Sequence, residues 1–186
     1  SASSTRDWLM KPFANSSCER LNSRSASVTL DSACVCDSRA VGSAPELNGF
    51  WQDGFRASEP VHVGVAVALR GGGVVAPAIH DADLKSAVEL MADLRDLVKR
   101  ARAGTLRSSE LADPTITVTS VGDRGPDAVW GVINPPQVAI VGVGTIVERP
   151  WVEDGAVVVH PTVTLTLSAD HRVTDGHRGG MFLTAI

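Results

Sequence analysis

The sequence predicts a single α/β (α+β) domain in which helices flank a mixed β-sheet. Runs rich in β-branched residues recur from residue 61 onward, and one strongly amphipathic helix lies among them. The 186 residues are enough for one hydrophobic core and few for two. With 44% apolar and 20% charged residues, the composition is typical of a globular protein.

The first strand signal is the run Val61–Leu69, which lies between Pro60 and three consecutive glycines. The glycines predict a tight reversal, so Val74–Ile79 is expected to return beside the first run as a hairpin. A phosphate-binding loop is disfavoured because these glycines precede a strand and no Gly-Lys-Ser/Thr ending follows.

The clearest predicted helix spans Asp83–Ala103. Its apolar residues recur every three or four positions and form one stripe: Leu84, Ala87, Val88, Met91, Leu94, Val98 and Ala101. Asp81 or Asp83 is expected to cap the start of this helix, and Gly104 stands where a terminating glycine is favoured.

Three further strands are predicted: Thr115–Val121, Val138–Val147 and Ala156–Ser168. The second is apolar almost throughout, which indicates a strand covered on both faces. Pro161 is expected to break the third, because proline cannot donate to a central ladder. Gly176–Ile186 predicts a final helix.

The bulk properties disfavour several classes of function. A net charge of -4 and a pI near 5.7 disfavour nucleic acid as the main partner. No apolar run reaches the ~18 residues that a membrane span needs. The three cysteines and five histidines lack metal-ligand spacing, so we expect no metal, reduced thiols and a cytoplasmic protein.

His171 is the most informative histidine. It follows the strand signal Val163–Leu167, with Asp170 before it and Asp175 four residues later. A histidine at a strand end, beside carboxylates, has the placement expected of a general base. Taken alone, an Asp-His-Arg triplet is weak evidence, and a buried structural histidine is then the favoured interpretation.

Several segments together resemble one known family. Asp170–Gly176 is similar to the DHRxxDG signature of the dihydrolipoamide acyltransferase component of 2-oxoacid dehydrogenase complexes. Other segments follow in the family's order: Pro45–Asn48 (its PELN corner), Gly64–Ala68, Arg102–Leu106 with Glu110 and Leu111, Thr115–Gly122 (its TFTISNLG strand) and Asn134–Gly144 (its NPPQ strand). The resemblance covers residues 45–186. Residues 1–44 match poorly, and the domain is expected to be truncated at its C-terminus.

The resemblance implies a chloramphenicol-acetyltransferase-like fold and acyl transfer between dihydrolipoamide and coenzyme A. It implies that His171 is the base and that Thr119, or the adjacent Ser120, stabilises the oxyanion. It also implies that Asp175 pairs with an N-terminal arginine, for which Arg6 and Arg20 are candidates. Supporting roles are expected for Asp170, Arg172 and Gly176.

The resemblance further implies a homotrimer or higher oligomer, in which the histidine of one subunit faces the hydroxyl of the next. The lipoyl group would be carried on another domain or chain, with other dehydrogenase-complex components as partners. A eukaryotic protein of this kind would lie in the mitochondrial matrix. Two alternatives stay open: a catalytically weak or inactive scaffold subunit, and an acetyltransferase acting on a free small molecule.

Overall fold

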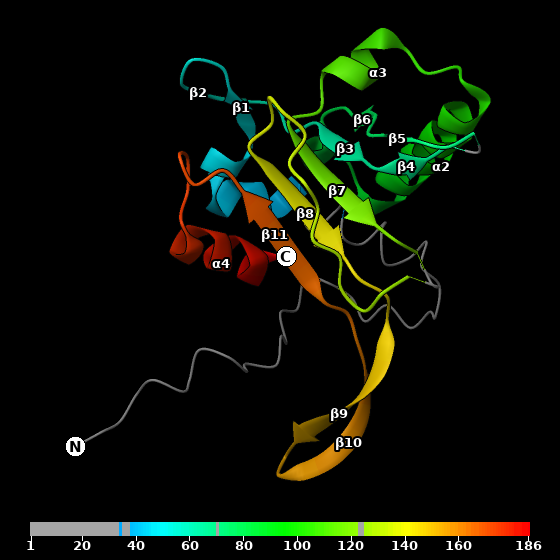
Figure 1. The fold of residues 1–186 in the computed structure, drawn as a ribbon. Helices are drawn as coiled ribbons and strands as arrows, with labels where there is room; N and C mark the ends of the chain where they lie inside the picture. The colour runs from blue at the N-terminus through cyan, green and yellow to red at the C-terminus, as the bar shows by residue number, and fades with distance from the viewer. Residues whose placement is uncertain (1–33, 35–37, 70, 123–124) are drawn as a thin grey trace.

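A five-stranded mixed sheet forms the centre of the computed structural model, which describes residues 34, 38–69, 71–122 and 125–186 (Figure 1). The strand order is β11-β8-β7-β3-β6. β7 runs parallel to β3 and β8, whereas the two edge strands, β11 and β6, are antiparallel to their neighbours. The strands are β3 (Val63–Val65), β6 (Ala78–Ile79), β7 (Ile116–Ser120), β8 (Ala139–Val143) and β11 (Leu165–Ala169).

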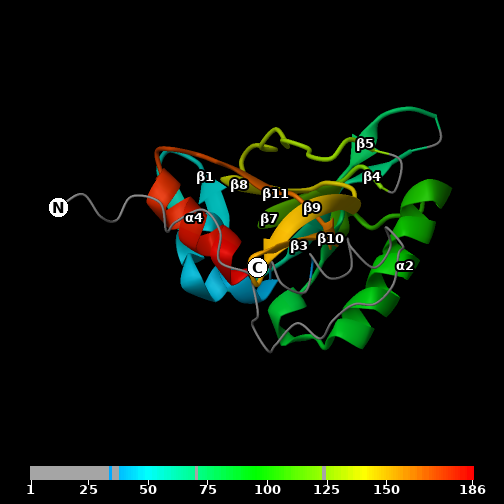
Figure 2. The same cartoon turned by 90° about the horizontal axis from the view of Figure 1, so that it is seen from below.

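The long helix α2 (Ala87–Ala103) and the C-terminal helix α4 (Gly176–Ala185) lie on the same side of the sheet (Figure 2). Leu94 of α2 and Phe182 of α4 join one hydrophobic core with strand residues such as Val118 and Val141. Residues 125–132 pass over the opposite face. A Cβ at Gly142 would collide there with the carbonyl oxygen of Val129, so only glycine fits this close approach.

The predicted start and apolar stripe of the long helix need correction. Ser86 caps α2 in a reciprocal capping box with Glu89, and a separate 3-10 turn, η3 (Ala82–Leu84), precedes it. Neither Asp81 nor Asp83 is the cap. Leu84 is 80% exposed and Val88 is 78% exposed, whereas the buried face of α2 is formed by Leu90, Leu94, Leu97 and Ala101. Gly104 ends the helix in the left-handed conformation, as predicted.

The predicted strands exist, with different bounds. The first run is divided into β3 and β4 (Val67–Ala68), and its predicted return into β5 (Val74–Val75) and β6. The expected glycine hairpin is confirmed, since β4 pairs antiparallel with β5. The predicted second strand is the shorter β8, which is buried along its whole length as expected.

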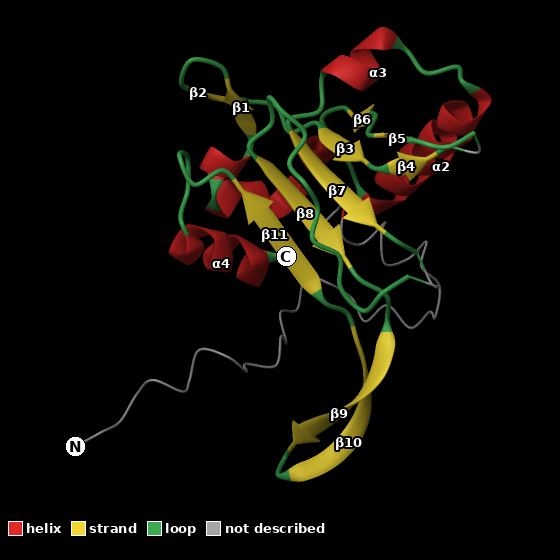
Figure 3. Ribbon diagram, viewed as in Figure 1, coloured by secondary structure: helices red, strands yellow, loops and turns green. Residues whose placement is uncertain are grey.

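The strand predicted from Ala156 to Ser168 is two strands in different sheets. β10 (Ala156–Thr162) pairs with β9 (Val147–Glu153), while β11 joins the central sheet. Pro161 does not break the strand, because it lies within β10 opposite Glu148. β9 and β10 form a hairpin that extends away from the body of the molecule (Figures 1 and 3). Sequence analysis also missed β1 (Gly49–Trp51), β2 (Phe55–Ala57), α3 (Ser108–Ala112), η1 (Val41–Ser43) and η2 (Pro45–Leu47).

One face of the β9–β10 hairpin is apolar and exposed. Val157 pairs with Val152, and Val159 pairs with Pro150. Val157 is 73% exposed, Val152 is 69% exposed and Val159 is 68% exposed. Contiguous exposed apolar surface is typical of regions that contact another molecule. Among the helices that the structure describes, none has the length and apolarity to cross a membrane.

Candidate active site

The turn that carries His171 joins β11 to α4 and is closed by hydrogen bonds to Asp170. The Asp170 carbonyl accepts the N–H groups of Val173 and Thr174, at 2.9 and 3.1 Å. Asp170 donates its own N–H to the carbonyl of Val138, next to β8. These contacts place His171 at the exposed tip of a short, well-connected turn at the edge of the sheet.

Arg172 strengthens the start of this turn. Its guanidinium binds the Asp170 carboxylate through Nε and Nη2, the latter at 2.6 Å, and its N–H donates to Oδ1 of the same carboxylate. The Arg172 side-chain hydrogen bonds, followed by the backbone hydrogen bond, lower the pKa of Asp170. The guanidinium also lies over the Trp51 ring, 4.1 Å from its centroid. Asp170 and Arg172 therefore connect the start of the turn through side-chain and backbone hydrogen bonds.

Asp175 ends the turn as the N-cap of α4. Its carboxylate accepts the N–H of Arg178 at 2.9 Å, and this backbone hydrogen bond is the main reason why its pKa is lowered. The predicted partners Arg6 and Arg20 lie outside the described residues. A Cβ at Gly176 would meet nothing within 4 Å, so the supporting role expected of this residue has no steric basis.

A groove of about 470 Å³ lies beside His171. Its walls come from the end of β11, the turn and the first two turns of α4, including Leu167, Thr174, Gly180 and Leu183. Among the described residues, none forms a hydrogen bond with the His171 ring. The imidazole is thus available to accept a proton from a molecule in the groove.

Thr119 lies in a different pocket. This cavity of about 320 Å³ is formed by β7, β8, β5 and residues 129–134. Within the described part of the chain, the Thr119 hydroxyl has no hydrogen-bond partner. Ser120 points to the other face of the strand, and its hydroxyl accepts the N–H of Gly122. Of the two candidates, Thr119 is therefore the better placed donor.

His171 and Thr119 lie at opposite ends of the sheet within one chain. Thr119 pairs with Gly142 of β8, whereas Ala169, two residues before His171, pairs with Ala139 at the other end of β8. Three residues of strand separate these positions by roughly 10 Å, and two strand spacings add roughly 10 Å across the sheet. A single copy does not bring the two predicted groups together.

Sequence analysis missed one strong polar contact near the turn. Arg178 binds the Glu46 carboxylate through Nε at 2.6 Å and Nη2 at 2.9 Å, and Nη2 also donates to the carbonyl of Ser43. This interaction lowers the pKa of Glu46. The two residues are 132 positions apart, and no local pattern relates them. Within the described residues, no group of three or more His, Cys, Asp or Glu side chains is arranged to hold a metal.

The chain is similar to known acyltransferases over most of its length. The family 2-oxoacid dehydrogenases acyltransferase (catalytic domain) matches residues 16–186. The dihydrolipoyllysine-residue acetyltransferase component of the pyruvate dehydrogenase complex of Rickettsia bellii is 35% identical over 164 residues, covering 87% of this chain and 39% of the relative. The chain thus spans about two fifths of that relative's length.

Solved structures agree with this similarity. The crystal structure of a probable dihydrolipoamide acetyltransferase from Listeria monocytogenes has a TM-score of 0.78 and 33% identity, covering 85% of this chain and 67% of that one. The Azotobacter vinelandii dihydrolipoamide acetyltransferase has a TM-score of 0.77 and 30% identity, covering 83% and 65%. That enzyme was studied for the roles of a serine, a histidine and an asparagine in its catalytic mechanism.

A chloramphenicol acetyltransferase has a TM-score of 0.52 at 13% identity and covers 84% of this chain and 74% of its own. At this identity the likeness concerns the fold alone. The predicted fold class and family resemblance are confirmed.

Proposed function

Because the chain belongs to the 2-oxoacid dehydrogenases acyltransferase (catalytic domain) family, we propose that it moves an acyl group between dihydrolipoamide and coenzyme A. The observation that carries the proposal is the His171 turn, which presents an imidazole without an internal partner to a groove of about 470 Å³. Coenzyme A acts here as a substrate, and the lipoyl group belongs to another domain or chain.

In the proposed reaction, His171 accepts the proton of the coenzyme A thiol while the sulfur attacks the thioester carbonyl carbon. Only a thiolate attacks well, so removal of this proton accelerates the step. The tetrahedral intermediate then collapses, and the bond from carbon to the lipoyl sulfur breaks. The leaving sulfur takes the proton back from His171, which returns the enzyme to its starting state.

The oxyanion of the tetrahedral intermediate needs a fixed hydrogen-bond donor, and we assign this role to Thr119. Its hydroxyl has no partner among the described residues and borders a pocket. A donor aimed at a developing oxyanion contributes about 3–4 kcal/mol in typical acyl-transfer sites. Because Thr119 is distant from His171 in one chain, the pair would act only across two copies.

A homotrimer or higher oligomer would supply the second copy. The exposed apolar face of the β9–β10 hairpin, formed by Pro150, Val152, Val157 and Val159, is a surface on which such copies could meet. One similar solved structure, at 28% identity, is the cubic core of a pyruvate dehydrogenase multienzyme complex. We therefore propose assembly into a related core with other complex components, in the cytoplasm or the mitochondrial matrix.

The direct test is transfer of an acetyl group from acetyl-coenzyme A to dihydrolipoamide by the purified protein and by His171→Ala. Loss of the general base should reduce kcat by about 10²- to 10⁴-fold. Equal rates in both proteins would refute the proposal. Coenzyme A binding without transfer in the wild type would indicate the scaffold alternative. Preference for a free small-molecule acceptor over dihydrolipoamide would indicate an acetyltransferase that acts on a free small molecule.

A further inference from the structure

The orientation of His171 depends on the backbone of its turn. Among the described residues no side chain forms a hydrogen bond with the imidazole. Its position is therefore set by where the turn begins, at Asp170, and by where it ends, at the N-terminus of α4. Contacts that hold these two points therefore limit where the ring can lie.

Both points are attached to the same segment of the chain, residues 43–51. At the end of the turn, Arg178 binds the Glu46 carboxylate with two hydrogen bonds and the Ser43 carbonyl with a third. The N–H of Arg178 is in turn held by Asp175. At the start of the turn, the Arg172 guanidinium lies over Trp51. Residues 43–51 thus form a cradle for the His171 turn.

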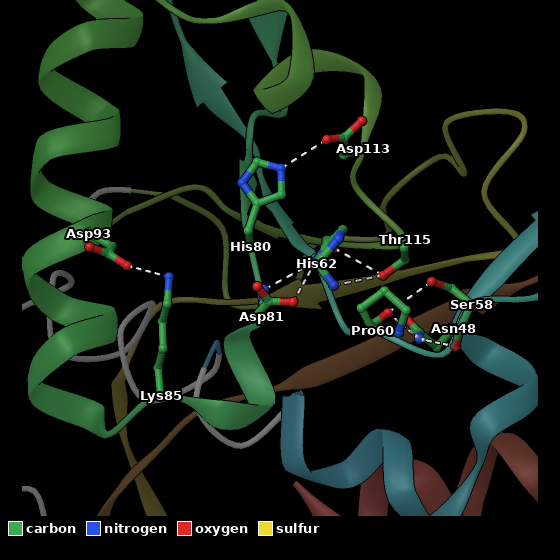
Figure 4. A network of polar contacts seen from close by, with 10 residues as sticks. All are labelled: Asn48, Ser58, Pro60, His62, His80, Asp81, Lys85, Asp93, Asp113 and Thr115. Atoms are coloured by element: carbon green, nitrogen blue, oxygen red, sulfur yellow. Dashed lines mark hydrogen bonds and ion pairs between the residues drawn. The ribbon is translucent and has the colours of Figure 1, made fainter.

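The cradle is itself fixed to the central sheet. Asn48 donates to the carbonyls of Ser58 and Pro60, at 2.9 and 3.0 Å (Figure 4). The N–H of Gly49 donates to the carbonyl of Thr115 next to β7, and the N–H of Trp51 donates to that of Pro136.

Thr115 joins the start of β3 through three hydrogen bonds with the backbone of His62 (Figure 4). Asn48 is 1% exposed and Thr115 is 2% exposed, so the hydrogen bonds of both side chains are shielded from water. Residues 43–51 are therefore firmly attached to the central sheet.

We propose that Glu46 and Arg178 are a positioning pair for His171, an inference that rests on the proposed function. Arginine binds a carboxylate with two parallel hydrogen bonds, which fixes direction as well as distance. The pair holds the first turn of α4, and with it the end of the His171 turn, against the cradle. Without it, the ring would sample positions away from the thiol, and small misplacements are costly to catalysis.

The test compares Arg178→Leu, Arg178→Lys and Glu46→Gln with the wild type. Each is assayed well below its melting temperature, so that folded protein is compared with folded protein. Arg178→Leu should lower kcat by about 10- to 100-fold while KM for coenzyme A changes little. Arg178→Lys keeps the positive charge but cannot form the two parallel hydrogen bonds with the Glu46 carboxylate. Its kcat should therefore lie between those of Arg178→Leu and the wild type.

A second ion pair provides the matched control. Arg100 of α2 binds Glu110 of α3, also at 2.6 Å, and Glu110 is buried. These helices contact β6, at the opposite edge of the sheet from β11. Arg100→Leu and Glu110→Gln should lower the melting temperature, as loss of a structural pair does, but leave kcat unchanged.

A readout independent of turnover separates this proposal from the proposed function. The His171 ring signals, assigned in NMR spectra by their absence in His171→Ala, should shift in Arg178→Leu and Glu46→Gln and not in Glu110→Gln. Wild-type kcat and unshifted ring signals in folded Arg178→Lys and Glu46→Gln would overturn the positioning role. An inactive wild type with shifted signals would refute the proposed function and leave the positioning role intact.

Discussion

The two ends of the central sheet differ in how they present their polar side chains. At one end, His171 stands on an exposed turn that is held by Asp170, Arg172 and Asp175. At the other end, Thr119 lies inside a strand, beside a pocket and partly covered by residues 129–132. The first end presents an exposed imidazole, and the second a hydroxyl on a strand of the sheet.

Strand direction explains why these two groups lie apart. β7 runs parallel to β8, whereas β11 runs antiparallel to it. β7 and β11 therefore finish at opposite ends of the sheet. Thr119, near the end of β7, and His171, just after β11, therefore lie apart within one chain. Under the proposed function, a site that uses both groups would need a second copy, and the following experiments test this.

Loss of assembly should have the largest effect. Val157→Glu with Val159→Glu places two carboxylates on the apolar face of the β9–β10 hairpin, where burial against another copy would be costly. We expect dissociation, measured by analytical ultracentrifugation, and acyl transfer as low as in His171→Ala. The control Val88→Glu changes an equally exposed valine on α2 and should leave both unchanged. An active monomer would contradict the composite site.

Removal of the Thr119 hydroxyl should have the next largest effect. Thr119→Val keeps the shape of the side chain but loses the donor, and kcat should fall by about 10²- to 10³-fold. Thr119→Ser keeps the hydroxyl and should stay near the wild-type rate. Ser120→Ala should also be near wild type, because Ser120 faces away from the pocket; a large loss there would move the donor role to Ser120.

Mixed oligomers sharpen the comparison further. When inactive His171→Ala and Thr119→Val subunits are dissociated, mixed equally and reassembled, an intact site forms where a wild-type His171 meets a wild-type Thr119. Random assembly predicts recovery of about one quarter of the wild-type rate, because each group is intact in half of the subunits. Mixtures as inactive as their parents would show that both groups act from the same chain.

Acid should produce the smallest effect, and it should act at the His171 end. The folded-state pKa values of Glu46 and Asp170 are lowered, mainly by their hydrogen bonds with Arg178 and Arg172. The stability that they contribute is present above their unfolded pKa values and is lost as the pH falls through the folded ones. The melting temperature should therefore decline below about pH 4, and less steeply in Glu46→Gln; parallel curves for both proteins would contradict this.

Local patterns predicted most of the sheet and the long helix correctly. The failures occurred where a local signal was overruled or overlooked. Ser86 with Glu89 is a capping box, and this pattern marks the true start of α2 better than Asp81 or Asp83. The pair Asp154-Gly155, both with positive φ, lies between β9 and β10 and is the turn signal that would have revealed this hairpin.

The sequence by itself determined the identity of the chemical groups. The Asp-His-Arg turn, the strand that carries Thr119 and the helix cap at Asp175 are local features, in which the chain contacts residues only a few positions away. Periodicity and motif resemblance are sufficient to find such features, because their physics is contained in short segments.

Only the tertiary structure decided the relations between distant segments. Neither the separation of His171 from Thr119 nor the contact of Arg178 with Glu46 follows from any local pattern. Both depend on which strands pair, and in which direction, and that choice is made by burial of the whole core at once. The groups of the site are thus local in origin, and their arrangement is global.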